Sequence, residues 1–208
     1  MIDTLTDTRR RILALPSSGL ATWRTLHIAI AGVTPLLMHN PSMMRRGATL
    51  GKKEIPTPEV EAEQGLYRIE ESGILYLKAD HVREAMKAAS AGWRINKKAA
   101  RPYLAGSVLE HPDIPFFPLF RDGEPIQTWG IDTRRAVVQR QGILRSRPVI
   151  QIPWSCEAVF RYDTEAIPAA DPILSILQQA GQTVGLLDYR PQKGGSFGRF
   201  VVTEAWEE

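Results

Sequence analysis

The sequence predicts an α+β fold in which two helices cover one face of a mostly antiparallel sheet. Apolar and polar residues alternate over 23–32 and again over 154–162, which is the pattern of half-buried strands. Apolar residues recur at helical spacing over 82–89 and 171–181. Two helices against one sheet form an α+β layer architecture. The chain has 208 residues, enough for one such domain with insertions.

The first strand is expected at 23–32, with Leu26, Ile28 and Ile30 on its apolar face. Residues 1–20 precede it as an N-terminal arm. Residues 33–65 contain four prolines and a basic patch, so they are expected to form an irregular insertion.

A hairpin and a helix are expected next. The apolar stretches 66–69 and 74–77 flank a Glu-Glu-Ser-Gly turn, which is typical of a hairpin. Asp80 then precedes the helical pattern of 82–89, so we expect its carboxylate to cap that helix.

The second half begins with an insertion over 92–150, whose aromatic cluster at 116–120 predicts short strands. Its last part, 130–150, is expected to form a long arginine-rich hairpin that turns around Gly142.

The strand at 154–162 leads to the clearest helix of the sequence. Asp171 is expected to cap this helix, Pro172 to occupy its first position and Gly181 to end it. A loop at 190–198 and a last strand at 200–203 follow. This order of elements fits a single domain over 1–208 with a ferredoxin-like sheet, two helices and long insertions.

Positive charge is concentrated in four windows that contain no Asp or Glu, although the net charge is only +3. They hold 16 of the 26 basic residues, and the rest of the chain is strongly acidic. Such segregation produces a local positive field of the kind that attracts a phosphate backbone. The cations are Arg45, Arg46, Lys52, Lys53, Arg94, Lys97, Lys98, Arg101, Arg134, Arg135, Arg140, Arg145, Arg147, Arg190, Lys193 and Arg199.

The loop 190–200 is the strongest motif. Its glycines would let the backbone approach a ligand and expose successive N–H groups, which together form an anion site. Phe197 could stack on a base or fill the core. The alternative is a glycine-rich turn with no ligand. The loop is not a P-loop, because no Gly-Lys-Ser/Thr ending is present. The glycines are Gly194, Gly195 and Gly198.

The window 134–147 is the second motif. Its five guanidiniums with no acid between them favour phosphate contact over salt bridging. The alternative is a surface hairpin whose charges keep an edge strand from aggregating.

Residues with enzymatic potential are few. His39 could be a general base, a metal ligand or a base-stacking ring, although a lone histidine is more often structural. Cys156 is the only cysteine, which excludes an internal disulfide and a cysteine-rich zinc site. We therefore expect no metal and no cofactor. No apolar run is long enough to span a bilayer and no signal peptide is present, so a cytoplasmic protein is expected.

The segments 194–200 and 75–85 resemble a known family. The first resembles the C-terminal glycine-rich loop of the RAMP superfamily, the RNA-binding proteins of CRISPR effector complexes; the second resembles its strand-then-helix step. The similarity is greatest to the backbone subunit that coats the guide, and to small stand-alone phage or prophage relatives. It implies an RRM-like sheet, a thumb at 130–150, filament assembly and a role in antiviral defence. Members that cut RNA use an aspartate after the first strand, whereas residues 33–53 contain no Asp or Glu.

Three functions are consistent with these observations. The first is sequence-independent binding of single-stranded nucleic acid, an RNA guide or single-stranded DNA, by a homo-oligomer or a ribonucleoprotein subunit. The second is a metal-independent endonuclease that uses His39 as general acid or base. The third is an assembly protein whose arginines contact an acidic partner.

Overall fold

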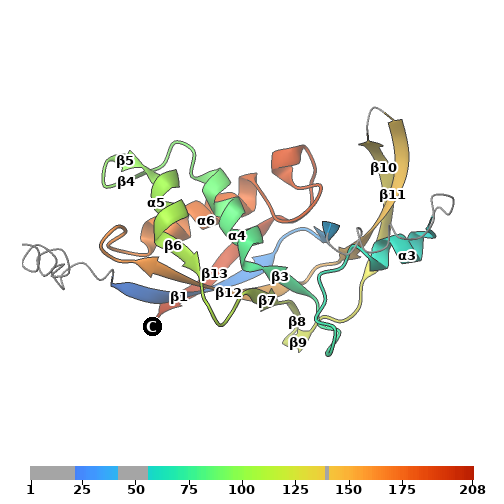
Figure 1. Ribbon diagram of the computed structural model, residues 1–208, viewed down its shortest axis with the longest axis horizontal. Coiled ribbons are helices and arrows are strands. Elements are labelled where there is room, and N and C mark those ends of the chain that lie inside the picture. Colours follow the sequence, from blue (N-terminus) through green and yellow to red (C-terminus); the bar gives the residue numbers. More distant parts are fainter. Residues whose placement is uncertain (1–21, 42–55, 139–140) are drawn as a thin grey trace, which may run out of the picture.

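A six-stranded antiparallel sheet forms the centre of the protein, with β1 (Trp23–Gly32) as one of its inner strands. Figure 1 shows the computed structural model, which describes residues 22–41, 56–138 and 141–208. β1 lies between β12 (Ser155–Asp163) and β13 (Phe200–Glu207) and pairs antiparallel with both. The two alternating patterns of the sequence therefore form neighbouring strands.

Short strands extend the sheet on the β12 side. β6 (Val108–Glu110) pairs with β12, and so does β8 (Phe120–Arg121), which in turn pairs with β9 (Glu124–Pro125). Two small ladders lie outside this sheet. They are β3 (Tyr76–Lys78) with β7 (Phe116–Pro118), and β4 (Arg94–Ile95) with β5 (Lys98–Ala99).

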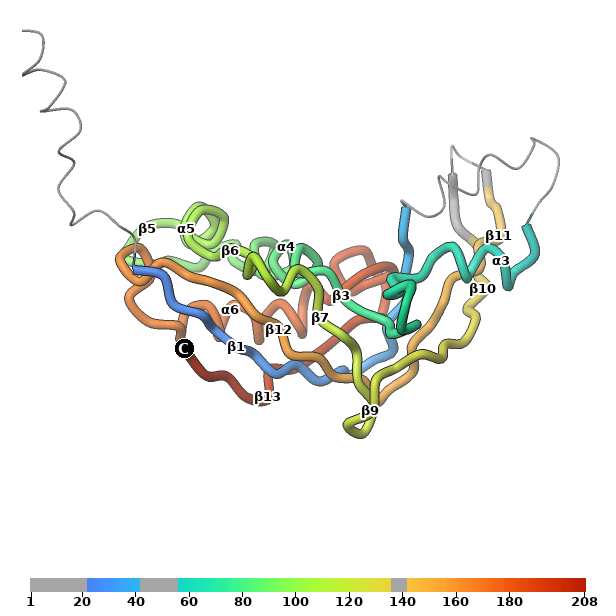
Figure 2. Tube along the Cα trace, turned by 60° about the horizontal axis from the view of Figure 1, so that its bottom comes forward, coloured from blue at the N-terminus to red at the C-terminus, as the bar shows by residue number. Residues whose placement is uncertain are grey.

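Helices α4 (Ala79–Ala89) and α6 (Asp171–Thr183) cover one face of the sheet, and α5 (Ala100–Ser107) lies beside them (Figures 1 and 2). The core between these layers is apolar and fully buried, so burial of apolar surface holds the helices on the sheet. Its members include Leu26, Ile28, Ile30, Val82, Met86, Ile173 and Leu177. The expected α+β class with an antiparallel sheet is confirmed.

Both predicted helix starts are off by one or two residues. α4 begins at Ala79, and its cap is Lys78, whose backbone N–H donates to the imidazole Nδ1 of His81. Asp80 is thus inside the first turn and is not the cap. α6 begins at Asp171, with Ala170 as its cap. The helix also continues through Gly181, which does not end it.

The predicted arginine-rich hairpin is present as β10 (Gly130–Val138) and β11 (Gln141–Ile150), which we call the ribbon. Val138 pairs with Gln141, so Gly142 lies within β11 opposite Val137 and is not in the turn. The ribbon projects away from the sheet (Figure 1).

Two elements hold the base of the ribbon. β2 (Leu36–Leu37) pairs with β11, and α3 (Pro58–Glu63) packs against both of its strands. Neither element is predicted by the sequence, because both are too short to show a period. α5 was also missed, since its Pro102 and Gly106 are typical of loops; Pro102 lies in the first turn, where proline is tolerated.

The fold predicts a large effect at Gly181. This residue is buried where α6 crosses β13, and a Cβ added there would lie 2.1 Å from the carbonyl oxygen of Phe200. Gly181→Ala must therefore push the helix off the strand, and we expect a loss of about 1–3 kcal/mol in the free energy of unfolding. Urea denaturation measures it.

Gly106→Ala is the matched control. Gly106 is also helical but exposed, and no atom lies within 4 Å of the position that a Cβ would take there. Here alanine should be neutral or stabilise by up to about 1 kcal/mol. Equal effects of the two substitutions would contradict the close approach of α6 to β13.

Candidate nucleic-acid interface

The ribbon and the glycine-rich loop, two of the four basic windows, meet in space. The guanidinium of Arg134 lies 4.5 Å from the ring centroid of Tyr189 and 4.7 Å from that of Phe197, and it also pairs with Asp132. Arg147 Nε lies 2.7 Å from Asp188 Oδ2. These contacts hold the β10–β11 ribbon against residues 188–197. We call their shared surface the ribbon–loop surface.

Three of the ribbon's arginines are ion-paired, contrary to the expectation from sequence. Besides the pairs of Arg134 and Arg147, Arg145 Nη1 lies 2.7 Å from Oε1 of Glu61. Glu61 is buried and also accepts a hydrogen bond from the Ser146 amide, which fixes α3 to the ribbon. Glu61 and Asp188 reach Arg145 and Arg147 from distant segments, whereas Asp132 lies two residues before Arg134, just outside the window.

Arg135 differs from these three arginines. It is exposed, and it has no ion pair among the residues that the structure describes. Its side chain lies over Gly142, where an added Cβ would come within 2.4 Å of Arg135 Nε. Arg135 therefore offers a free guanidinium on the ribbon. The predicted cations Arg45, Arg46, Lys52, Lys53 and Arg140 lie outside the described residues.

The glycine-rich loop does not expose successive N–H groups, so that expectation was wrong. Its amides are used within the protein: Gly194 donates to Pro191, Gly195 to Arg190, and Gly198 to Pro35. The amide of Phe197 likewise donates to the carbonyl of Tyr189. A phosphate at this loop would have to be bound mainly by side chains.

Two of the loop's glycines are explained by its own packing. A Cβ on Gly195 would lie 1.7 Å from the Tyr189 carbonyl oxygen, and one on Gly198 would lie 2.1 Å from that of Leu186. Gly194 is exposed, with a φ of +79° and nothing near its Cβ position. Contact of these glycines with a phosphate stays a prediction.

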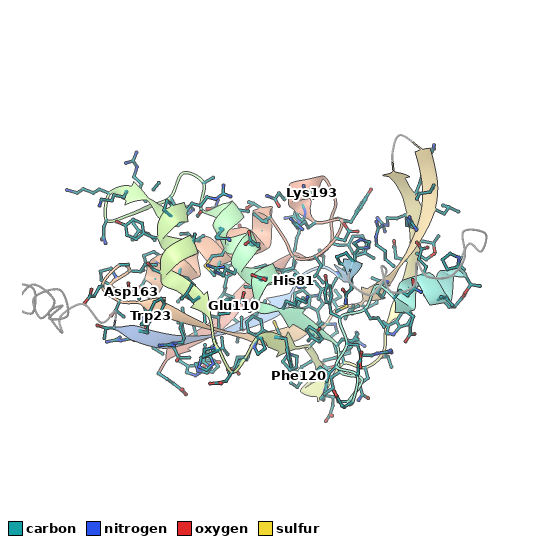
Figure 3. The ribbon with its side chains drawn as sticks, viewed as in Figure 1. Trp23, His81, Glu110, Phe120, Asp163 and Lys193 are labelled. Atoms are coloured by element: carbon teal, nitrogen blue, oxygen red, sulfur yellow. The ribbon has the colours of Figure 1, made fainter. Side chains whose placement is uncertain are left out.

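None of the loop's cations has an ion pair within the described part of the chain. Arg190 donates to the Leu187 carbonyl and to Gln192 Oε1, and Arg199 donates to the Gln182 carbonyl near the end of α6. Lys193 is exposed at the top of the loop (Figure 3). These bonds orient the two guanidiniums and leave their charge uncompensated.

The window 94–101 lies elsewhere. It forms the β4–β5 hairpin and the start of α5, at the opposite end of the molecule from the ribbon in Figure 1. Its four cations, Arg94, Lys97, Lys98 and Arg101, are exposed. This hairpin is on the helical side of the sheet, as the glycine-rich loop is (Figures 1 and 2).

The open face of the sheet has a different character. Ala29 on β1 faces away from the core and is paired with Glu157 on one side and Glu204 on the other. His27, also on β1, contacts this group. Its Nδ1 lies 2.6 Å from Glu157 Oε1, and its ring stacks on that of Trp206 with the two centroids 5.0 Å apart. This face therefore places the carboxylates of Glu157 and Glu204 on the strands that flank β1.

A pocket of about 380 Å³ opens between the start of α4 and the glycine-rich loop. It brings together the predicted His39 and a second histidine, His81, which the sequence did not single out. Burial lowers the pKa of both imidazoles, that of His81 to about 4. Both rings are therefore neutral at pH 7. The other lining residues are Pro41, Tyr67, Asp80, Glu84, Ala85, Gly185, Leu187, Asp188 and Arg190.

The walls of this pocket are held by specific contacts. Tyr67 donates its hydroxyl to the backbone carbonyl of His39, and its ring meets His81 edge-on at 4.7 Å. Burial, and then the nearby Asp80 carboxyl, raise the pKa of Glu110. No group of three or more potential metal ligands occurs among the described residues, and none of their helices has the length and apolarity to cross a bilayer.

No protein-family model and no curated protein matches the sequence. The fold is similar to that of a chain in the cryo-EM structure of the Type III-B Cmr-beta bound to cognate target RNA, with a TM-score of 0.58 and 9% sequence identity. The similarity covers 98% of this chain and 65% of that one, so this chain spans less than two thirds of its neighbour's length. At this identity the likeness shows a shared fold.

His81 makes stability depend on pH. Its pKa is near 4 in the folded protein and about 6.5 in an unfolded chain, so between these values the unfolded state binds more protons. Stability should therefore fall as the pH drops through this window, by about 2 kcal/mol at pH 5 from this residue alone.

His81→Asn tests this dependence, because the Asn side chain keeps an acceptor for the Lys78 amide but does not titrate. Chemical denaturation at pH 7 and pH 5 should show a smaller difference between the two pH values for the variant than for the parent. An unchanged difference would mean that His81 is not held neutral by burial.

Proposed function

We propose that this protein binds single-stranded nucleic acid without sequence preference through the ribbon–loop surface. The observation that carries the proposal is the docking of two distant basic segments onto each other. Arg134 and Arg147 hold the two segments together, whereas Arg135, Arg190 and Lys193 have no ion pair with a described residue. Arg199 likewise has no ion pair with a described residue. A set of cations that have no ion pair with a carboxylate is suited to phosphates.

The two faces of the sheet support a path along the helical side. The glycine-rich loop and the distant β4–β5 hairpin lie on that side, whereas Glu157 and Glu204 lie on the open face. Carboxylates repel a phosphate backbone. A strand would therefore run from the ribbon past the loop, over the helices and toward the β4–β5 hairpin.

The similarity in fold supports the choice of ligand and of assembly. The neighbour belongs to a complex bound to target RNA, and we propose that this chain is likewise a subunit of a CRISPR-type ribonucleoprotein that coats RNA as an oligomer. The strand order β13-β1-β12-β6, with α4 following β1 and α6 following β12, supports a ferredoxin-like core. In this proposal the ribbon acts as the thumb.

Removal of a free cation should weaken binding equally for all sequences. We expect Arg135→Ala and Lys193→Ala each to lower affinity for an oligouridylate. Each should also reduce the slope of log K against log salt concentration by roughly 0.7–0.9, because each removes about one phosphate contact. Fluorescence anisotropy across a salt series measures both quantities.

Arg161→Ala is the matched control. Arg161 lies on the open face of the sheet, where its guanidinium is 5.6 Å from the Trp23 ring. Its loss should leave the slope unchanged. If Arg135→Ala and Lys193→Ala also bind like the parent at about 150 mM salt, phosphates do not contact the ribbon–loop surface.

Metal-independent cleavage of nucleic acid is a second candidate, favoured by the pocket that gathers His39, His81 and Arg190. A neutral imidazole can act as a general base, and a guanidinium can stabilise a phosphorane-like charge. His39 is the better placed base, since its imidazole, unlike that of His81, does not serve as a helix-capping acceptor.

This activity predicts cleavage of labelled RNA in the presence of EDTA. His39→Ala should reduce the rate by about 100-fold or more if the imidazole transfers the proton. Cleavage that persists in the variant points to a contaminant or to another base. RNA that stays intact with either protein eliminates the candidate.

A further inference from the structure

The pocket beside the glycine-rich loop is not explained by a phosphate-binding surface. It is a cavity of about 380 Å³, within the range of small-ligand sites. Its wall includes three carboxylates, those of Asp80, Glu84 and Asp188, against one guanidinium, that of Arg190, and this balance does not favour a phosphate. The pocket therefore requires a ligand with hydrogen-bond donors, although a phosphate surface lies beside it.

The pocket offers acceptors from α4. Asp80 and Glu84 lie one helical turn apart, so their side chains project from the same face of the helix. Both are exposed residues, which allows their oxygens to accept hydrogen bonds from a ligand. Glu84 is also ion-paired with Lys87, which orients its carboxylate.

Donors come from the opposite wall and from His81. Because Nδ1 of His81 accepts the Lys78 amide, the proton of its neutral ring is on Nε2. Arg190 is braced by Leu187 and Gln192, and two of its five N–H groups remain for a ligand. A bound molecule would meet the Asp80 and Glu84 carboxylates and the His81 ring from α4, and the Arg190 N–H groups and the Asp188 carboxylate from the loop segment.

Flat surfaces complete the pocket. Tyr67 and His81 meet edge to face, and Pro41, Ala85 and Leu187 add apolar area to the walls. A small planar, aromatic ligand fits such a lining. Arg190 belongs both to this wall and to the ribbon–loop surface, so a ligand in the pocket can be covalently joined to a phosphate outside it.

We propose that the pocket takes one unstacked guanine base of the bound nucleic acid. The Watson–Crick edge of guanine presents N1–H and the 2-amino group to a carboxylate, and its O6 and N7 accept from a guanidinium, the commonest specific contact to this base. Two other bases are useful for comparison with guanine. Uracil has no amino group at all, and hypoxanthine differs from guanine only by lacking the 2-amino group. The site would therefore add a preference at one nucleotide to binding that is otherwise independent of sequence. This proposal rests on the proposed function.

The test uses oligouridylates of about 15 nucleotides whose central residue is uridine, guanosine or inosine. Anisotropy should show the guanosine oligomer binding about 5- to 10-fold more tightly than the other two. The double variant Asp80→Asn/Glu84→Gln should bind all three alike. The control Glu124→Gln/Glu165→Gln removes two exposed carboxylates outside the pocket and should keep the preference.

Equal affinities of the parent for the guanosine and uridine oligomers overturn the guanine site while leaving the proposed function intact. A preference that survives in the Asp80→Asn/Glu84→Gln variant overturns it as well.

If no oligomer binds, the proposed function fails, and the site is then decided with free nucleotides. Saturation-transfer NMR should detect GMP on the parent but not on the Asp80→Asn/Glu84→Gln variant, with IMP and UMP as references of equal charge. Signals of equal strength from the three nucleotides, or from none of them, overturn the site.

Discussion

The ion pair between Arg147 and Asp188 fixes the position of the ribbon, and the rest of the candidate interface depends on it. Arg147 comes from β11 and Asp188 from the segment that leads into the glycine-rich loop, so the pair joins an internal insertion to the C-terminal part of the fold. The side chains are 15% and 33% exposed, which places the pair in a partly desolvated setting. Loss of one partner would leave an uncompensated charge there, which costs far more than an exposed pair contributes.

The stacking of Arg134 on the loop also holds the ribbon in its orientation. A guanidinium lies over two rings, Tyr189 and Phe197, while Asp132 holds its edge. An arginine can do this because its planar group stacks and donates hydrogen bonds at the same time, whereas a lysine cannot. Phe197, which the sequence suggests as a base-stacking platform, is therefore occupied by the protein's own cation.

The sequence predicted the framework better than the site. β1, β12, α4 and α6 follow from periodicity, because each has one face buried over enough residues for a repeat to appear. α3 has six residues, too few for a period to be recognised. The order of charges in the sequence was also misleading, since Glu61 and Asp188 reach the ribbon's arginines from far along the chain. A window without acids therefore does not exclude ion pairs with acids that lie outside it.

The same reasoning explains why the pocket could not be found from motifs. His39 and His81 are 42 positions apart in the sequence, and neither belongs to a recognisable catalytic pattern. They share a cavity because Tyr67 contacts both: its hydroxyl donates a hydrogen bond to the His39 carbonyl, and its ring packs against that of His81. The loop that closes the cavity is in turn held by the ribbon through Asp188. An insertion in the middle of the chain thus shapes a site whose polar groups lie mainly in the α+β framework, and a change in ribbon docking should alter pocket and phosphate surface together.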